Sequence, residues 1–281
     1  MKIFHHCDPD GWSSASIVYN WASQLFDPKC VSINYPQTIN IEDIQLNEIV
    51  YILDYSIPPE NMLELLNKTP NVVWIDHHKT AIDKYENFPR QIAGIRDCAD
   101  AGCELTWKYL YKEKQMPLSV KLIGDYDCWK WNYGEQTRQF FCGIKLLNND
   151  PTSREWIDLL ISDDYAKSLL ENGAVIDKYL KMDNRISCNK TYEIQFEGHK
   201  CIVLNTNNKG SLTFEKIDDG KYEILVVWQY CEDKNKEKLF TVSLYAGKNS
   251  GIDVSEICKK YGGGGHKSAA GFTTKNIDVL L

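Results

Sequence analysis

The sequence has no long hydrophobic run and no excess of basic residues. Its longest uncharged apolar segments, such as residues 49–53 and 224–228, are far shorter than the ~20 residues that cross a bilayer. The N-terminus reaches polar residues at His5 and His6, without the apolar stretch of a signal peptide. The 32 basic and 39 acidic residues give a net charge of −7, so no broad positive surface can track long nucleic acid. These absences predict a soluble, cytoplasmic protein that binds neither a membrane nor long strands.

Cysteine pairs with the C-x-x-C spacing are also absent, although the chain contains 10 cysteines. Their absence excludes the commonest zinc-ribbon and dithiol redox motifs. What remains is an ordinary globular composition, with 43% hydrophobic and 25% charged residues. A length of 281 residues predicts about two domains.

The first half of the chain alternates between short apolar runs and helical patterns. Strands are expected at residues 2–5, 49–53 and 72–75, and the last two are apolar throughout, as in strands that are buried on both faces. Helices are expected at residues 11–26 and from Pro58-Pro59 to residue 67. This order predicts an α/β domain with a doubly wound parallel sheet.

In the second half of the chain, the sequence pattern changes from helical to strand-like near residue 190. Helical patterns dominate residues 103–187, and a long helix over 174–186 leaves the first domain. Strands at 192–196 and 200–204 flank Glu197-Gly198, which is a hairpin signal, and residues 222–230 and 239–245 form a second strand pair. We therefore expect one domain over residues 1–189 and a smaller α/β domain over residues 190–281.

Polar side chains gather where the predicted strands end. His6, Asp8 and Asp10 follow the first strand, and Asp54 and Asp76 each follow an apolar strand directly. Because parallel strands end at the same edge of a sheet, these groups should converge. Carboxylates packed so closely repel one another unless a cation neutralises them. Taken singly, each has a plainer explanation, such as a solvated acidic turn with Asp10 as a helix cap.

Two further polar segments could complete such a site. Asp76 leads into His77 and His78, which supply imidazole nitrogens for a cation or a phosphate. Asp125 and Asp127 follow the apolar segment 118–123. Either carboxylate could join the site, but for Asp127 alone a surface or supporting role is the favoured interpretation. A helix is expected to open at residues 100–104.

Four consecutive glycines at residues 262–265 precede His266 and Lys267. The segment is not a Walker A loop, because His266 stands where the glycine before the lysine should be. Its backbone permits amide N–H groups to approach an anion closely, with the two side chains as further donors. The alternative is a loose connecting loop.

Together these segments resemble the DHH/DHHA1 phosphoesterase superfamily over nearly the full chain. The matching motifs are His6-x-Asp8-x-Asp10-Gly11, Asp54, Asp76-His77-His78, Asp125 and Gly263-Gly264-Gly265-His266-x-x-Ala269-Ala270-Gly271. All five occur in order at plausible spacing. The chain is most similar to the branch of short-oligonucleotide and nucleotide phosphodiesterases.

The resemblance implies two divalent metal ions, usually Mn²⁺ with Mg²⁺ or Co²⁺ as alternatives, and hydrolysis by a water that they activate. The implied ligands are His6 and Asp8 for one ion, Asp10, His77 and Asp125 for the other, and Asp54 between them. Asp76 would support these ligands, and His78 would contact the scissile phosphate. The resemblance also implies that the N-terminus of the helix at residues 100–104 faces the site. Gly263, Gly264, Gly265 and His266 would bind a phosphate or terminal nucleotide. The implied active site lies in the cleft between an N-terminal DHH domain and a C-terminal DHHA1 domain.

The substrate is the least determined point. Relatives often have an arginine where this chain has Tyr245, and a tyrosine can stack on a base but cannot hold a phosphate through two hydrogen bonds. Trp129 and Trp131 are further candidates for stacking. A pyrophosphatase or exopolyphosphatase is the first alternative, although related pyrophosphatases have three residues between the first histidine and aspartate. A non-catalytic nucleotide-binding module is the second, and the oligomeric state stays open.

Overall fold

The computed structural model describes residues 1–35, 37–207, 209–233 and 235–280, the side chain of Val279 excepted. The chain forms two compact units, Met1–Asp177 and Lys178–Leu281. The division falls inside the long helix α8 (Asp163–Cys188), and the first strand of the second unit, β5, begins at Tyr192. The sequence predicts a boundary near residue 190, just after the end of α8, whereas the two compact units divide within that helix, after Asp177.

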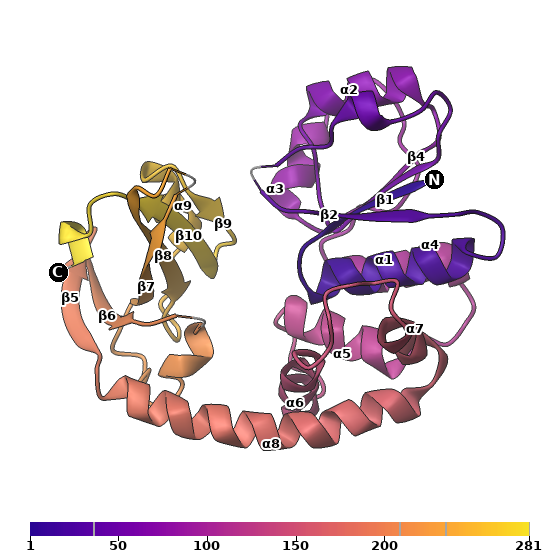
Figure 1. Cartoon of the computed structure of the whole chain (residues 1–281). Helices are drawn as coiled ribbons and strands as arrows, with labels where there is room; N and C mark the ends of the chain where they lie inside the picture. Colours follow the sequence, from indigo (N-terminus) through magenta and orange to yellow (C-terminus); the bar gives the residue numbers. More distant parts are fainter. Residues whose placement is uncertain (36, 208, 234, 281) are drawn as a thin grey trace. The chain divides into compact units, whose positions relative to one another are not determined.

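A four-stranded parallel sheet forms the centre of the first unit (Figure 1). Its strands are β1 (Lys2–His6), β2 (Lys29–Ile33), β3 (Val50–Leu53) and β4 (Val72–Ile75), in the order β2-β1-β3-β4. The pairs β1–β2, β1–β3 and β3–β4 are all parallel. Three of these strands agree with the predicted ones. The edge strand β2 was not predicted, because most of its side chains are exposed and its sequence lacks an apolar run.

Alternate side chains of the central strands face two separate cores. Phe4, Ile52 and Trp74 pack into a cluster with α2 (Pro59–Lys68) on one face. Neighbouring residues of the same strands, such as Ile3 and Leu53, pack into a second cluster on the other face, with α1 (Pro9–Ala22) and α4 (Gly102–Tyr111). Figure 1 shows α2 on one side of the strands and α1 and α4 on the other. The predicted doubly wound α/β fold is therefore confirmed.

The rest of the first unit is mainly helical, as the pattern predicts. The short elements η1 (Ile41–Asp43), α3 (Lys79–Ile82) and η2 (Asp83–Tyr85) connect the sheet region. After α4 come α5 (Leu118–Asp127), α6 (Glu135–Ile144), α7 (Arg154–Ile161) and α8, which share a core of their own. Among the described residues, no helix combines the length and the apolar content that a membrane span requires.

The second unit is built on a six-stranded sheet in the order β5-β6-β7-β8-β10-β9. Its elements are β5 (Tyr192–Phe196), β6 (His199–Asn205), η3 (Ser211–Phe214), β7 (Ile224–Glu232), β8 (Lys238–Ala246), α9 (Val254–Lys260), β9 (Gly264–Gly265), β10 (Ala269–Thr274) and η4 (Asp278–Leu280). Among the described strands of this sheet, the β6–β7 pair is parallel and the other pairs are antiparallel. Both predicted hairpins are confirmed, and the first turns at Glu197 and Gly198, whose φ angles of 52° and 83° suit a two-residue turn.

Candidate metal centre at the strand ends

The parallel sheet contains a topological switch point between β1 and β3. The chain leaves β1 to form β2 on one side, and β3 pairs with the other side of β1. Ligands of open α/β sheets bind beyond the carboxyl ends of the strands at such a point. His6 is the last residue of β1, and Asp54 and Asp76 directly follow β3 and β4. The topology thus brings three polar positions to one edge of the sheet.

The first group of polar atoms lies at the end of β1. His6 Nδ1 is 2.6 Å from Asp8 Oδ2 and 3.7 Å from Asp54 Oδ2. The other oxygen of Asp8 accepts a hydrogen bond from the backbone N–H of Gly11 at 2.9 Å, so Asp8 is the N-cap of α1. The cap fixes the Asp8 carboxylate in place with one oxygen against the imidazole.

The second group surrounds His77. Its Nε2 atom is 3.2 Å from Asp54 Oδ1, 3.4 Å from Asp127 Oδ2 and 3.8 Å from Asp10 Oδ2. The three carboxylates come from the residue after β3, from α5 and from α1, which are far apart in sequence. One nitrogen with three carboxylate oxygens around it is the donor set of a divalent cation.

Asp10 owes its position to the start of α4. Its two carboxylate oxygens accept the backbone N–H groups of Gly102 and Cys103, both at 2.7 Å. Amides at a helix N-terminus favour such an anion. A Cβ atom on Gly102 would lie 2.9 Å from the Asp54 Cβ and 3.0 Å from Asp10 Oδ2, so this close approach requires glycine. The expectation that a helix near residue 102 faces the site is confirmed.

Asp54 lies between the two groups. Its backbone has a φ of 51°, in the left-handed region that is uncommon for residues other than glycine. The side chain is 1% exposed, and its Oδ1 has no hydrogen-bond partner within the described residues. Asp54 therefore presents one oxygen to His6 and the other to His77 from a fixed, buried position.

Asp76 organises the loop after β4. Its Oδ1 accepts the backbone N–H groups of His77 and His78 at 2.8 and 3.2 Å, and lies 2.8 Å from His78 Nδ1. Asp76 is fully buried, and its Oδ2 has no hydrogen-bond partner in the described part of the chain. The carboxylate thus holds both histidines at the sheet edge.

Asp125 does not approach the imidazoles among the contacts that the described residues make. This carboxylate accepts the backbone N–H groups of Asn132 and Tyr133 at 2.8 and 3.3 Å and the hydroxyl of Thr137, so it ties the end of α5 to α6. Asp127 is two residues further along α5 and approaches His77 instead. Two residues correspond to about 200° of helical rotation, so the two side chains leave opposite sides of α5.

Cys128 is a neighbour of the centre that the sequence analysis did not find. Its Sγ lies 3.9 Å from Nδ1 of His77, whereas Nε2 of the same ring faces the carboxylates. A histidine ligand is usually oriented by a partner on its second nitrogen. Here the Cys128 thiol is that partner. The only hint of this in the sequence is that Cys128 directly follows Asp127.

Burial and like charges perturb the ionisation of these groups. Burial, then the charges of Asp10 and Asp8, raise the pKa of Asp54 well above its usual value, and burial and Asp10 raise the pKa of Asp127 to about 8. Burial alone would lower the pKa of His6, but the carboxylates of Asp54 and Asp8 outweigh it and raise that pKa to about 11. Burial would likewise lower the pKa of His77. The hydrogen bond to Cys128 and the charges of Asp10 and Asp127 outweigh burial and raise that pKa to about 10. Without a cation the cluster retains protons.

The donor atoms fit divalent ions. Three overlapping groups each have their donor atoms within 4.8 Å of one another: His6-Asp8-Asp54, Asp54-His77-His78 and His77-Asp127-Cys128. Carboxylate oxygens and imidazole nitrogens suit Mn²⁺ and its neighbours in the first transition row. The unpartnered buried oxygen of Asp54 is a place where a cation would replace a missing hydrogen bond.

Two family models match parts of the chain. Residues 1–125 match the DHH family N-terminal domain, and residues 212–281 match the DHHA1 domain. The chain carries the two domains of the DHH/DHHA1 family. Members of the DHH family are phosphoesterases. The family predicted from the sequence is confirmed.

Two curated relatives align at low identity. An uncharacterized protein, R106, of Acanthamoeba polyphaga mimivirus is 24% identical over the whole chain and 69% of its own length. The oligoribonuclease NrnB of Bacillus subtilis is 24% identical over 80% of the chain and 59% of its own length. The chain thus spans less than two thirds of NrnB.

Solved structures of the family share the fold. A pGpG-specific phosphodiesterase, PggH, of Vibrio cholerae has a TM-score of 0.52 at 14% identity and covers 97% of this chain and 92% of its own. RecJ of Thermus thermophilus in complex with Mn²⁺ has a TM-score of 0.51 at 12% identity and covers 96% of this chain and 49% of its own.

In the DHHA1 domain, the glycine run forms a tight hairpin rather than a loose loop. β9 pairs with β10, and residues His266 and Ala269 exchange backbone hydrogen bonds of 2.8 and 3.2 Å across a turn formed by Lys267 and Ser268. The N–H of Gly263 donates to Cys258 at 2.9 Å. The amides of Gly263, His266 and Ala269 therefore donate within the chain, whereas Gly265 and the turn residues Lys267 and Ser268 are exposed.

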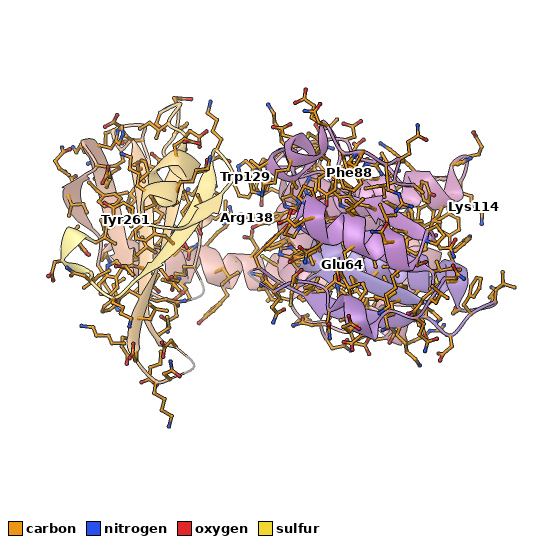
Figure 2. All side chains as sticks on the ribbon, turned by 90° about the horizontal axis from the view of Figure 1, so that it is seen from above. Glu64, Phe88, Lys114, Trp129, Arg138 and Tyr261 are labelled. Atoms are coloured by element: carbon orange, nitrogen blue, oxygen red, sulfur yellow. The ribbon has the colours of Figure 1, made fainter. Side chains whose placement is uncertain are left out.

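The aromatic candidates for stacking differ in exposure. Tyr245 pairs with Ala269 and packs partly against the core of the DHHA1 domain, which favours a packing role. Trp129 is 47% exposed, with its ring centroid 4.9 Å from that of Trp131 and 5.4 Å from that of Tyr126 (Figure 2). Of the three stacking candidates, Tyr245, Trp129 and Trp131, Trp129 is therefore the most accessible to a ligand.

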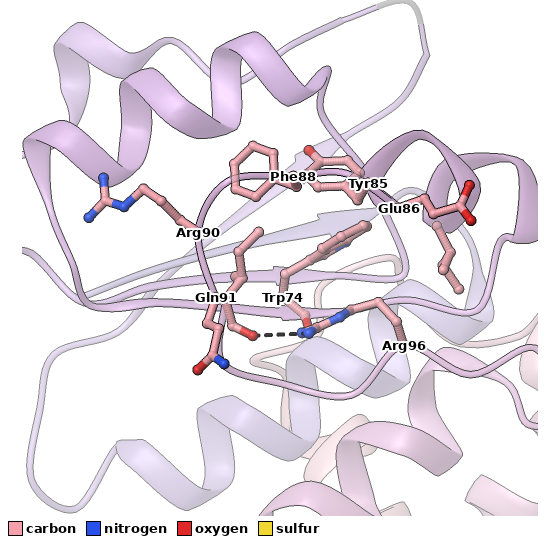
Figure 3. A pocket seen from close by; sticks show the side chains of 9 residues that line it. Trp74, Tyr85, Glu86, Phe88, Arg90, Gln91 and Arg96 are labelled. Carbon is pink, nitrogen blue, oxygen red and sulfur yellow. Dashed lines mark hydrogen bonds between the residues drawn. The ribbon is translucent and has the colours of Figure 1, made fainter.

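A hollow of about 460 Å³ lies elsewhere in the DHH domain, and its lining contains none of the strand-end carboxylates or imidazoles. Trp74, Tyr85 and Phe88 form part of its wall (Figure 3). Arg96 lies over the Trp74 ring at 5.4 Å and donates to the backbone oxygens of Trp74, Ile92 and Ala93. These hydrogen bonds show that the Arg96 guanidinium stabilises the wall of the hollow.

Proposed function

We propose that this protein is a two-metal phosphodiesterase that hydrolyses short oligonucleotides or small nucleotides. The observation that carries the proposal is Asp54, a buried carboxylate whose two oxygens face two separate donor groups. The names of two relatives, an oligoribonuclease and a pGpG-specific phosphodiesterase, support the class of substrate.

The proposed ligands follow the geometry of the strand ends. His6 and Asp8 hold one ion, Asp10, His77 and Asp127 hold the other, and Asp54 contacts both. Asp127 takes the place that the sequence analysis gave to Asp125. Bound divalent cations, Mn²⁺ foremost because RecJ structures contain it, supply Lewis acidity and lower the pKa of a water.

The remaining residues position these ligands and the substrate. Asp76 fixes the His77-His78 loop, and His78 contacts the scissile phosphate. Gly263, Gly264, Gly265 and His266 bind a terminal phosphate or nucleotide. The net charge of −7 limits the enzyme to short substrates, because each phosphate of a long strand needs a cationic partner.

The test is a cleavage assay with Mn²⁺ on pGpG, other oligonucleotides of two to five residues, strands of about twenty, a cyclic dinucleotide, 3′-phosphoadenosine 5′-phosphate and pyrophosphate. We expect the short oligonucleotides or small nucleotides to be cleaved fastest. Cleavage of pyrophosphate alone would favour the phosphoanhydride hydrolase, and nucleotide binding without turnover would favour the non-catalytic module. Equal rates on short and long strands would contradict the short-substrate preference.

A further inference from the structure

The long helix α8 has two apolar faces of different kinds. One face packs against its own chain: Leu169 is buried, and a Cβ atom on Gly173 would lie 1.8 Å from the backbone oxygen of Gln139 in α6. On the same face, buried Asp177 is 2.5 Å from the Arg138 Nε atom of α6 (Arg138 is labelled in Figure 2). This inner face is therefore buried against other residues of the same chain.

The opposite face carries large apolar side chains that are open to solvent. Val175, Tyr179, Met182 and Ile186 are 71%, 61%, 57% and 55% exposed. At 100° per residue they lie roughly 150° around the helix from the buried face. Surface helices normally present polar residues on the side away from their core. Four exposed apolar side chains in one row are the mark of an interaction surface.

The spacing of this row has the form of a heptad repeat. With the exposed Asn172, the positions are separated by three, four, three and four residues, which is the spacing of the a and d positions of two heptads and the a position of a third. We call the five residues the α8 seam: Asn172, Val175, Tyr179, Met182 and Ile186. It extends over about 21 Å of helix at 1.5 Å per residue.

We propose that the α8 seam binds the same seam of a second copy of this chain, as a parallel pair of helices. Asn172 stands at an a position, where a polar residue favours in-register pairing. In the parallel arrangement Lys178, at a g position, faces Asp183 of the copy at an e position. Asp183 already pairs with Lys209 of its own chain, but its side chain stays 38% exposed. A fully overlapping antiparallel pair would instead place Lys178 against Arg185 of the copy, which is repulsive.

The resulting dimer is expected to be weak. A seam of two heptads is far smaller than the ~1,600 Å² of a standard interface. The helix is nevertheless already ordered by its inner face, so pairing costs little further conformational entropy. We therefore expect a concentration-dependent equilibrium, with the dimer forming in the micromolar range.

The test is sedimentation velocity of the full chain from about 1 to 100 µM. We expect the mass to rise from monomer towards dimer, and Met182→Lys to shift this transition at least tenfold upward in concentration. Ile161→Lys is the matched control, because Ile161 is 66% exposed in α7 but lies outside the seam. A wild-type chain that stays monomeric throughout, or equal effects of both variants, would overturn the proposal.

The charge pattern provides a second test that decides the orientation. Lys178→Glu places two acidic side chains opposite each other in the parallel pair and should weaken the dimer. In the antiparallel pair the same change would create an attraction to Arg185 and strengthen it. Tighter association of Lys178→Glu would therefore overturn the parallel arrangement.

Discussion

The two domains offer their polar groups in opposite ways. In the first unit, Asp10, Asp54 and Asp76 are each at most 1% exposed, and they lie at the ends of parallel strands or at the helix that follows. In the second unit, the residues of the glycine hairpin turn, His266 and Lys267 among them, are exposed. One region consists of buried charges, and the other of a backbone turn with side chains in solvent.

The difference follows from sheet topology. Parallel strands all end at one edge, so a single residue after each strand contributes to a common site. In an antiparallel sheet the ends alternate, and polar groups gather only where a hairpin turns. We therefore expect charge changes in the first region to alter metal binding and stability strongly. In the second region, substitutions of the hairpin glycines should change the stability of the hairpin alone, and by a smaller amount.

The largest effect is expected from Asp54→Asn. Loss of the carboxylate between the two donor groups should remove several kcal/mol of transition-state stabilisation, on the order of a thousandfold in rate. The metal-free variant should differ from the wild type by less than about 0.5 kcal/mol, because burial and the charges of Asp10 and Asp8 raise the pKa of Asp54 and favour its neutral form, which asparagine resembles. Cleavage rates with Mn²⁺ measure the first effect, and melting curves with a chelator and with Mn²⁺ measure stability and metal binding. A variant that Mn²⁺ still stabilises as strongly as the wild type would contradict the shared-ligand role.

The next effect separates two neighbouring carboxylates on α5. Asp127→Asn should weaken Mn²⁺ binding by about 10–100-fold. Its control, Asp125→Asn, should leave Mn²⁺ affinity unchanged and cost about 1–3 kcal/mol of stability, because the hydrogen bonds to Asn132, Tyr133 and Thr137 are weakened. Calorimetric titration and denaturant unfolding report the two quantities. The reverse result would restore Asp125 as the ligand.

A third effect concerns pH. The metal-free pKa values of about 11 for His6 and about 10 for His77 mean that both rings hold a proton at neutral pH, which Mn²⁺ must displace. Affinity should therefore rise with pH, about tenfold per unit for each proton released. Titrations between pH 6.5 and 8.5 in buffers of different ionisation enthalpy count the protons. An affinity independent of pH would show that both rings are already neutral in the metal-free protein.

The smallest effect is expected in the glycine hairpin. Gly265 has a φ of 141°, and a Cβ atom there would lie 2.6 Å from the Ala270 Cα, so Gly265→Ala should cost about 1–3 kcal/mol. Gly264→Ala is the matched control, because nothing lies within 4 Å of its Cβ position, and it should change stability by less than about 0.5 kcal/mol. Neither variant should change Mn²⁺ affinity. A weaker Mn²⁺ affinity in Gly265→Ala would show that the hairpin and the metal centre are coupled.

Much of the fold and half of the site could be predicted from local sequence. Apolar runs that end in aspartate or histidine indicate buried parallel strands, and the topology of such strands brings His6, Asp54 and Asp76 to one edge. The Glu197-Gly198 turn was likewise predictable, because its residue types suit a two-residue hairpin. These features depend on short-range periodicity and on backbone conformation.

Only the tertiary structure decided which residues complete the centre. Sequence spacing shows that Asp125 and Asp127 leave opposite sides of α5, but the packing of α5 against its neighbours determines which side faces His77. The role of Cys128 was also hidden, since it depends on a close approach between residues that are 51 positions apart. The exposed seam of α8 has the same origin: the heptad spacing is in the sequence, but only packing shows which face of the helix the chain leaves uncovered.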